Sequence, residues 1–264
     1  KTGTLTQDEI ILEYPLDIHA NLDMGVLKIA YLNSYFQTGL KNLLDRAIIT
    51  RTEKEADEHE ILQNLATRYQ KIDELPVDFE RRRMSVIVKE DDEAVLVTKG
   101  ALEEMLSIST HVKDGDVVHP ITDEIRESIL EAVSSLNEQG LRVLGVSQKK
   151  YQDIHHAFTV EDESNMILMG YLAFLDPPKP SAAPAIQALK EHGVTTKILT
   201  GDNEKVTLTV CEKVGLPVDK VLLGTEIEDM SDFSSARSVA IDPRSVDRDY
   251  REYVIAVTIR FLIE

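Results

Sequence analysis

The chain has 264 residues, 42% of them hydrophobic, and a formal net charge of −18. The hydrophobic share is enough for a packed core, which excludes wholesale disorder. The strong negative charge excludes a nucleic-acid partner, because such a partner requires a surface rich in Lys and Arg. It does not exclude ATP, since a few cations are enough to hold one triphosphate.

Cysteine use and hydropathy indicate the setting. The single cysteine, Cys211, cannot form an internal disulfide, and no N-x-S/T sequon occurs, so we expect a reducing, cytosolic environment. No apolar run approaches the roughly 20 residues that span a bilayer, so we expect no membrane contact by this chain itself. The apolar segment at 253–264 is interrupted by Arg260 and is expected to be a buried strand. The histidines have no spacing that indicates a metal site.

The first part of the chain is expected to be α+β. Residues 51–72 are predicted to form a charged surface helix. Residues 81–101 are predicted to form two strands joined by an acidic turn. Residues 111–121 are predicted to form a hairpin with Asp114 and Gly115 at its turn.

An amphipathic helix is expected over residues 122–140. Thr122 is its predicted N-cap and Gly140 its terminator. Apolar residues at helical spacing give it one buried face: Ile125, Ile129, Val133 and Leu136. Residues 141–151 and 166–176 are then expected to be strands.

The proline-rich stretch DPPKPSAAP, at 176–184, separates this region from a second unit. A helix is expected to run from there to Gly193, followed by an apolar strand at 194–199. The polar loop TGDN at 200–203 then leads into a helix over 206–214. This order is the α/β arrangement in which ligands bind at the carboxyl ends of strands.

Two segments place small hydroxyl residues beside a glycine: KTGTLT at 1–6 and TGDN at 200–203. Such loops direct backbone N–H groups and hydroxyls at an oxyanion. Lys1 adds positive charge, and Asp202 is placed to orient a hydroxyl or a lysine. TGDN alone is most simply an ordinary turn, whereas the six-residue string KTGTLT is far more specific.

KTGTLT resembles the phosphorylation motif of P-type ATPases, in which an aspartate immediately precedes the lysine and accepts the γ-phosphate of ATP. The resemblance implies a chain that starts one residue downstream of that nucleophile. It also implies a catalytic group that cradles the transferred phosphate, and it makes the Thr2 carbonyl a Mg²⁺ ligand. The implied catalytic residues are Lys1, Thr2, Thr200, Gly201 and Asp202.

Further segments resemble motifs of the same family in the expected order, and the resemblance covers Lys1 to about Met230. They are GLKNLLDRAI, PVDFERRRMSVIV, VTKGALEEML, LRVL, DPPK and TGD. The resemblance implies residues near the adenine, in the adenine pocket and at the phosphates. This implied nucleotide-binding set is Asp45, Phe79, Arg81, Arg82, Lys99, Gly100 and Arg142.

Each implied ligand also has a structural alternative. The arginines at 81–83 would alternatively solvate an edge strand, although so close to Phe79, in so acidic a chain, a phosphate or stacking role is favoured for at least one. Lys99 would alternatively be a strand-end charge. Arg142 would alternatively pair with a carboxylate, and Asp45 would be a helix-surface acid; for these two the readings are nearly balanced.

The sequence also departs from the family pattern. The nucleophilic aspartate is absent, and no GDGxND occurs, so an aspartate that helps to hold Mg²⁺ is absent too. Val77 stands where the family usually has an aromatic residue that stacks on adenine. Phe79 is its expected substitute, because alternate residues of a strand face the same side. Residues 232–264 do not resemble the family's continuation.

The expected fold class is therefore α/β and α+β. Residues 10–174 are expected to form a central α+β nucleotide-binding domain with an antiparallel sheet and helices. It is inserted into a partial haloacid-dehalogenase-like, Rossmann-like phosphorylation domain made of residues 1–9 and 175–231. Residues 232–264 form a separate C-terminal segment.

The resemblance implies a parent protein of the cell membrane that couples ATP hydrolysis, through an aspartyl-phosphate, to cation transport, with ATP and Mg²⁺ as cofactors. This portion would lie on the cytoplasmic side. IDELPVDFERRRMSV and the segment from AFLDPPK to TGDN look most like the bacterial magnesium-transporting branch. Alone, the chain is expected to bind ATP or ADP without turnover. The alternatives are a haloacid-dehalogenase-like phosphatase and a free-standing adenine-nucleotide-binding or regulatory module.

Overall fold

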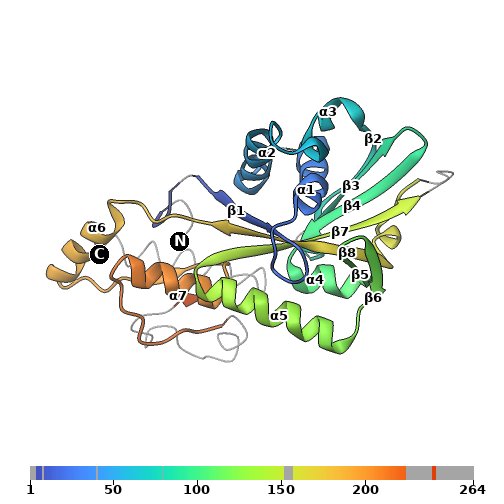
Figure 1. The fold of residues 1–264 in the computed structure, drawn as a ribbon. Coiled ribbons are helices and arrows are strands. Elements are labelled where there is room, and N and C mark those ends of the chain that lie inside the picture. Colours follow the sequence, from blue (N-terminus) through green and yellow to red (C-terminus); the bar gives the residue numbers. More distant parts are fainter. Residues whose placement is uncertain are drawn as a thin grey trace. The chain divides into compact units, whose positions relative to one another are not determined.

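The computed structural model describes residues 4–7, 9–39, 41–78, 80–151, 157–223 and 240–241. It divides into two compact units (Figure 1). We call one the central unit, made of Glu9–Leu136 and Leu141–Leu175, and the other the flanking unit, made of Lys1–Asp8, Asn137–Gly140 and Asp176–Glu264. The fold class is α/β with a mixed sheet.

The central unit is built on an eight-stranded sheet, in which seven strands have the order β2-β3-β4-β7-β8-β5-β6 and the eighth, β1, pairs with β8. The strands are β1 (Ile11–Leu16), β2 (Gln70–Asp78), β3 (Arg83–Glu90), β4 (Glu93–Gly100), β5 (Ser109–Asp114), β6 (Val117–Pro120), β7 (Leu141–Tyr151) and β8 (Met166–Leu175). The expected antiparallel pairing holds except between β5 and β8, which run parallel. The sheet is therefore mixed.

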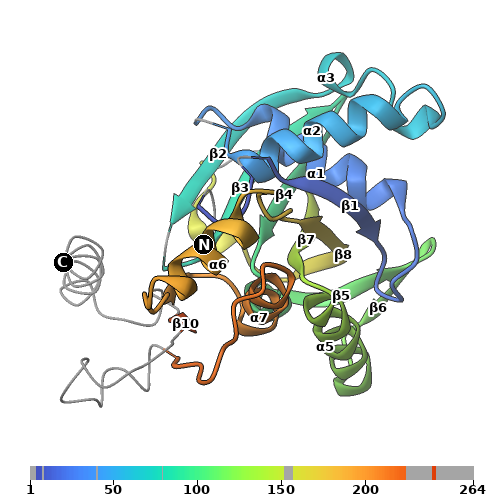
Figure 2. The ribbon, with the colours of Figure 1, turned by 90° about the vertical axis from the view of Figure 1, so that its left-hand side faces the viewer.

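Helices cover both faces of this sheet, with α1 and α2 on one side and α4 and α5 on the other (Figures 1 and 2). The helical elements are α1 (Met24–Phe36), α2 (Leu43–Glu55), η1 (Glu60–Leu62), α3 (Leu65–Arg68), α4 (Leu102–Ile108), α5 (Asp123–Glu138) and η2 (Val160–Asp162). Val86 and Val97 pack under α1 and α2, whereas Leu168 and Tyr171 pack against α4 and α5. Because both faces are buried, the inner strands read as nearly continuous apolar runs.

The flanking unit contains the predicted strand, polar turn and helix. Its elements are α6 (Ala182–Glu191), β9 (Ile198–Leu199), α7 (Glu204–Lys213) and β10 (Ala240–Ile241). β9 and β10 pair in parallel. Cys211 is buried in its core with Ile186 and Ile198. Gly193 and Gly215 have φ of 75° and 71° just after α6 and α7, as expected for helix-terminating glycines.

The helix predicted for residues 51–72 is wrong. α2 ends at Glu55, and β2 already begins at Gln70. Between them Asn64 adopts a left-handed conformation with φ of 56°, which a continuing helix does not allow. Leu65 lies in the core beside α1. Burial of this apolar side chain therefore outweighs the charged helical pattern around it.

The other elements predicted for the central unit lie where the sequence places them. The turn between β3 and β4 includes Asp91 at φ 52°, and the β5–β6 hairpin turns at Gly115 with φ of 57°. In α5, the Thr122 hydroxyl accepts the Ile125 N–H at 3.3 Å, and Ile129 is buried. The strand predicted for 253–264 lies outside the described residues. Across the described part of the chain, no helix combines the length and the hydropathy that a membrane crossing needs.

Gly170 in β8 is a position where no side chain fits. Its φ is +150°, and a Cβ there would lie 2.1 Å from the Leu16 carbonyl oxygen and 2.9 Å from a Val26 methyl carbon. We expect Gly170→Ala to lower the free energy of unfolding by on the order of 3 kcal/mol, measured by urea denaturation. Gly39→Ala, where a Cβ meets nothing within 4 Å, is the control; equal losses in the two variants would contradict this account.

Acid sensitivity is expected at the Glu90 carboxylate. Hydrogen bonds from Tyr69 and then Arg68 hold the pKa of Glu90 below its usual range, with Arg68 Nε at 2.8 Å. Since the folded pKa is depressed, this stabilisation is complete above the unfolded value of about 4.3 and is lost as pH falls through the folded value. Between about pH 6 and about pH 3, Arg68→Gln should lose less unfolding free energy than the wild type. The same loss in both proteins would exclude this role.

Candidate functional site

The centre of the candidate site is a buried ion pair between Asp45 on α2 and Lys99 on β4. Asp45 is 1% exposed and Lys99 7% exposed. The Lys99 ammonium donates to Asp45 Oδ1 and to the Ser34 hydroxyl on α1, at 2.6 Å. Lys99 lies opposite Met84 and Val146 in the neighbouring strands, on the sheet face that α1 and α2 cover. Lys99 is indeed near the end of β4, but its charge is buried and paired with Asp45.

Asp45 is held by the first turn of α2. Its N–H donates to Asn42 Oδ1 at 3.0 Å, and its Oδ2 accepts the Asn42 N–H at 3.1 Å, which is a capping box. Gln37 at the end of α1 donates to the same Oδ2 at 2.5 Å. These bonds fix the carboxylate in the interior, so the alternative that Asp45 is a helix-surface acid is wrong.

The environment of Lys99 has opposing electrostatic effects. Burial lowers the pKa of Lys99, because water no longer solvates the charged form, and the negative charge of Asp45 opposes that shift. Lys41 lowers the Lys99 pKa further. The ammonium therefore depends on Asp45 as its counter-ion.

Gly100 is the last residue of β4, and its backbone packs against the turn that precedes β3. A Cβ at Gly100 would lie 2.6 Å from the Arg82 carbonyl oxygen and 2.6 Å from Arg83 Cβ. The same carbonyl accepts the Ala101 N–H at 3.2 Å. The chain's own backbone thus requires glycine here, and the approach of Gly100 to an adenine ring stays a prediction.

The arginines at 81–83 all contact carboxylates. Arg81 and Arg83 bind Glu163 at 2.6 and 2.7 Å, whereas Arg82 binds Glu104 on α4. Arg83 begins β3, which lies between β2 and β4, and its side chain is only 13% exposed. The interpretation that these residues solvate an edge strand is therefore wrong for Arg83, while a phosphate or stacking contact stays a prediction for Arg81 and Arg82, of which Arg82 is the more exposed.

The structure does not bring Arg142 next to Lys99. Arg142 lies on β7 opposite Phe174 of β8, four residues before Val146, the residue that faces Lys99. By strand alternation it shares the face of Lys99, about 13 Å away along the strand at 3.3 Å per residue. Val77 is 56% exposed on β2, and Phe79 lies outside the described residues.

In the flanking unit, the Thr200–Asp202 loop joins β9 to α7. The Thr200 hydroxyl accepts the Asp202 N–H at 3.1 Å, and both residues are buried. Gly201 lies between them. Asn203 caps α7 by accepting the Lys205 N–H at 2.9 Å, so the loop precedes a helix N-terminus, which suits an anion. The implied catalytic residues Lys1 and Thr2, with the metal role of Thr2, lie outside the described residues.

The described end of the KTGTLT segment, residues 4–6, lies beside the DPPK segment in the same unit. Lys179 N–H donates to the Leu5 carbonyl at 2.8 Å, and Gln7 N–H donates to the Pro177 carbonyl at 2.9 Å. Two motifs that are about 170 residues apart in the chain are thereby joined, as a domain inserted between them requires.

Motif reading alone missed three residues of the central unit. Ser34 on α1 contacts Lys99, and Gln37, just after α1, contacts Asp45. Glu163 binds two arginines. Their partners are distant in the sequence, so no local spacing marks them.

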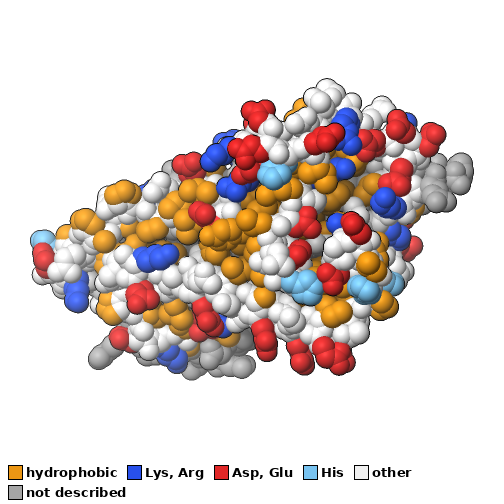
Figure 3. All heavy atoms as spheres, viewed as in Figure 1, with side chains coloured by type: hydrophobic (Ala, Val, Ile, Leu, Met, Phe, Trp, Pro, Cys, Tyr) orange, Lys and Arg blue, Asp and Glu red, His pale blue; other side chains and the backbone are white. Residues whose placement is uncertain are grey.

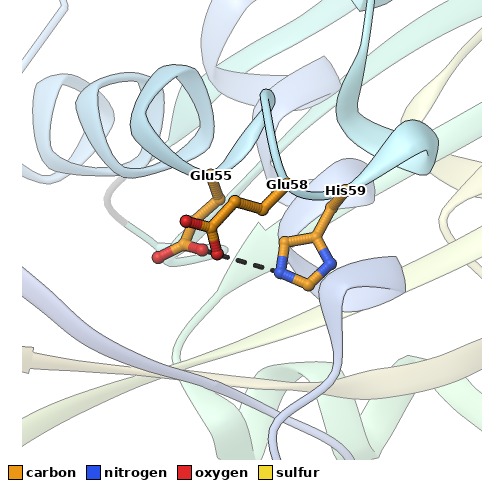
Figure 4. Close-up of side chains that lie close together, drawn as sticks. All are labelled: Glu55, Glu58 and His59. Atoms are coloured by element: carbon orange, nitrogen blue, oxygen red, sulfur yellow. Dashed lines mark ion pairs between the residues drawn. The ribbon is translucent and has the colours of Figure 1, made fainter.

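One carboxylate–imidazole cluster occurs among the described residues, formed by Glu55, Glu58 and His59 (Figure 4). Glu55 already binds Arg51 at 2.9 Å and His59 at 3.6 Å. Because Arg51 balances the charge of Glu55, we assign no metal to this surface cluster.

Residues 29–181, more than half of the chain, match the family model described as P-type ATPase, cytoplasmic domain N. The chain belongs to the P-type ATPase family, and this membership does not favour the phosphatase or free-standing-module alternatives.

Among its curated relatives, the chain is 49% identical over 88% of its length to the protein named Magnesium-transporting ATPase, P-type 1 of Escherichia coli K12, of which it covers 25%. It is 48% identical over 91% of its length to the protein of that name in Salmonella typhimurium LT2, of which it covers 26%. Identity to Calcium-transporting ATPase 1 of Bacillus cereus is 29% over 65% of the chain and 19% of that protein. The chain thus spans about a quarter of the length of the magnesium-transporting relatives.

The buried pair makes a prediction for stability. Asp45→Asn and Lys99→Met each leave one charge buried without its partner, at a cost of about 3–5 kcal/mol in the free energy of unfolding. The double variant leaves neither charge, so its loss should be well below the sum of the single losses. Urea denaturation of the four proteins measures this coupling.

A matched control for this cycle is the exposed pair Lys150–Glu93, with side chains 56% and 53% exposed. Its removal should change the free energy of unfolding by less than about 1 kcal/mol. Simple additivity of the Asp45 and Lys99 losses would show that the two side chains do not depend on each other.

Proposed function

We propose that this chain is the ATP-binding portion, with part of the phosphorylation portion, of a P-type ATPase that transports magnesium. The observation that carries the proposal is the buried Asp45–Lys99 pair: it joins the two motifs that resemble the family's adenine site, although they lie 54 residues apart. The names of the two magnesium-transporting relatives reported above support the choice of magnesium.

We infer that residues 10–174 are the nucleotide-binding domain and that residues 1–9 and 175–231 belong to the phosphorylation domain. The division of the chain into two compact units changes at Asp8–Glu9 and at Leu175–Asp176, which supports these outer boundaries; within them, Asn137–Gly140 alone is assigned to the flanking unit. The pairing of the KTGTLT and DPPK segments within one unit supports them as well.

Binding of ATP requires local positive charge on an acidic protein. Acidic side chains are spread over much of the face shown in Figure 3, and the net charge is −18. An ATP site must therefore collect cations. In our proposal Lys99 contacts the adenine, while Arg82 and Arg142 approach the phosphates. Ser34 and Asp45 orient the Lys99 ammonium by accepting two of its hydrogen bonds.

The reaction of the parent would be phosphoryl transfer, which depends on positioning the triphosphate and neutralising its charge. In our proposal the Thr200–Asp202 loop, before the N-terminus of α7, holds the transferred group together with Lys1 and Thr2. The Asp202 carboxylate and the Thr2 carbonyl are oxygen donors of the kind that Mg²⁺ takes; a bound Mg²⁺ would neutralise phosphate charge there.

We further propose that the parent protein lies in the cell membrane, with this portion on the cytoplasmic side, and couples ATP hydrolysis to cation movement. The family description, which places domain N in the cytoplasm, supports this. Since the relatives are about four times as long as this chain, the path of the cation would lie outside these residues.

Calorimetric titration with ATP tests the proposal directly. The wild-type chain should release heat at millimolar ATP, and Lys99 and Arg82 resonances should shift in NMR spectra. Lys99→Met should weaken binding at least about tenfold, which is about 1.4 kcal/mol. Lys150→Met, which removes an exposed lysine of β7, should bind as the wild type does. Absence of heat from the folded wild-type chain would refute ATP binding.

A further inference from the structure

Glu163 is a fully buried carboxylate on the sheet face opposite Lys99, with a side chain that is 0% exposed. It follows the short helix η2, in the segment that joins β7 to β8. Its Oε2 accepts from Arg81 Nη1 at 2.6 Å and from Arg83 Nε at 2.7 Å. Its Oε1 accepts the Ser85 hydroxyl at 2.6 Å. One carboxylate therefore holds both arginines that flank Arg82.

The surroundings of Glu163 keep this carboxylate in place. The Ser85 hydroxyl also bonds the Thr98 hydroxyl at 2.7 Å across β3 and β4. Lys149 donates to the carbonyls of Asp162 and Ser164, on either side of Glu163, at 3.4 and 3.1 Å. A buried carboxylate is unfavourable unless it is paired, and the two guanidinium groups provide that pairing.

The two arginines impose a shape on the turn before β3. Because Arg81 and Arg83 both reach Glu163, Arg82 between them is directed elsewhere, to Glu104 of α4. Its φ is +47°, a left-handed conformation that a residue with a Cβ adopts only when its surroundings hold it there. The Glu163 pairings hold the residues on both sides of Arg82, and Arg81 Nη2 also donates to the Pro76 carbonyl at 2.8 Å.

This turn in turn fixes the end of β4. The Arg82 carbonyl accepts the Ala101 N–H at 3.2 Å and is the atom that a side chain at Gly100 would strike. Lys99 is the preceding residue. A continuous set of contacts therefore runs from Glu163, through Arg81 and Arg83, to the backbone that carries Lys99.

We propose that Glu163 is a positioning residue for the nucleotide site: by clamping Arg81 and Arg83 from the far face of the sheet, it sets the Arg82 turn and the Lys99–Ala101 end of β4 for nucleotide. The inference rests on the proposed ATP binding. Glu163 does not touch the nucleotide, and acts through the shape of the turn.

The test is Glu163→Gln, which keeps the size of the side chain and removes its charge. At a temperature well below its thermal unfolding transition, the variant should bind ATP about tenfold more weakly, as measured by calorimetry. Loss of a residue that orients ligand-binding side chains has an effect of about this size at metal sites. Without nucleotide, its Ala101 amide should exchange with solvent at least about tenfold faster in NMR, because the bond to Arg82 loosens. Glu161→Gln, an exposed glutamate two residues away, is the matched control and should change neither quantity.

If Glu163→Gln does not fold, a second variant, Arg83→Lys, weakens the same Glu163–Arg83 pairing by changing the arginine instead of the carboxylate. Lysine keeps the charge but loses the planar fork that reaches Glu163 and Glu104, so the same two changes are expected. A folded variant with lower thermal stability but unchanged Ala101 exchange and unchanged ATP affinity would overturn the proposal. If the wild type binds no ATP, the ATP proposal fails, while the Ala101 exchange still decides whether Glu163 positions the turn.

Discussion

Lys99 and Asp45 meet in the interior, where neither charge is tolerable without the other. Their pairing constrains much of the central unit. Asp45 must sit in the first turn of α2, Lys99 must face α1 near the end of β4, and Ser34 and Gln37 must complete the hydrogen bonds. Two helices and a strand are thus placed by one electrostatic requirement. Such an arrangement costs stability that an apolar pair would not, and the proposed contact of Lys99 with a nucleotide would explain why the charge is kept.

The end of β4 carries polar contacts on both faces of the sheet. Lys99 faces α1 and α2, while Thr98, one residue earlier, faces the opposite side and bonds Ser85 beside Glu163. Because successive residues of a strand alternate between faces, two polar networks that never touch directly share the same short backbone segment. The turn at Arg82 closes this segment. The two networks are therefore connected through the backbone of this segment.

Local patterns predicted the elements whose signals are local. The Asp114–Gly115 hairpin and the Thr122–Gly140 helix needed only turn and cap chemistry, and both lie where expected, whereas the strand predicted for 194–199 is shortened to Ile198–Leu199. The helix predicted for residues 51–72 is wrong because burial of Leu65 in the core outweighs the charged helical pattern around it.

The contacts within the candidate site were harder to predict than the helices and strands. The motif resemblance selected Asp45 and Lys99, but only the tertiary structure reveals that they form an ion pair. No local pattern around Glu163 predicts that it binds two arginines some 80 residues away in the sequence. The parallel pairing of β5 with β8 likewise depends on long-range topology.

The first and last strands of the central unit are neighbours, since β1 pairs with β8 and Ile11 lies opposite Leu175. Apart from the short excursion at Asn137–Gly140, the chain therefore enters and leaves the unit at one place, with Ile11 and Leu175 about 5 Å apart, the usual spacing of paired strands. A module of this kind is portable: it can be gained, lost or exchanged at a surface loop of a host without stretching the host's own backbone. The same geometry makes it a natural candidate for expression as an independent folding unit, or for circular permutation with a short linker across the old ends.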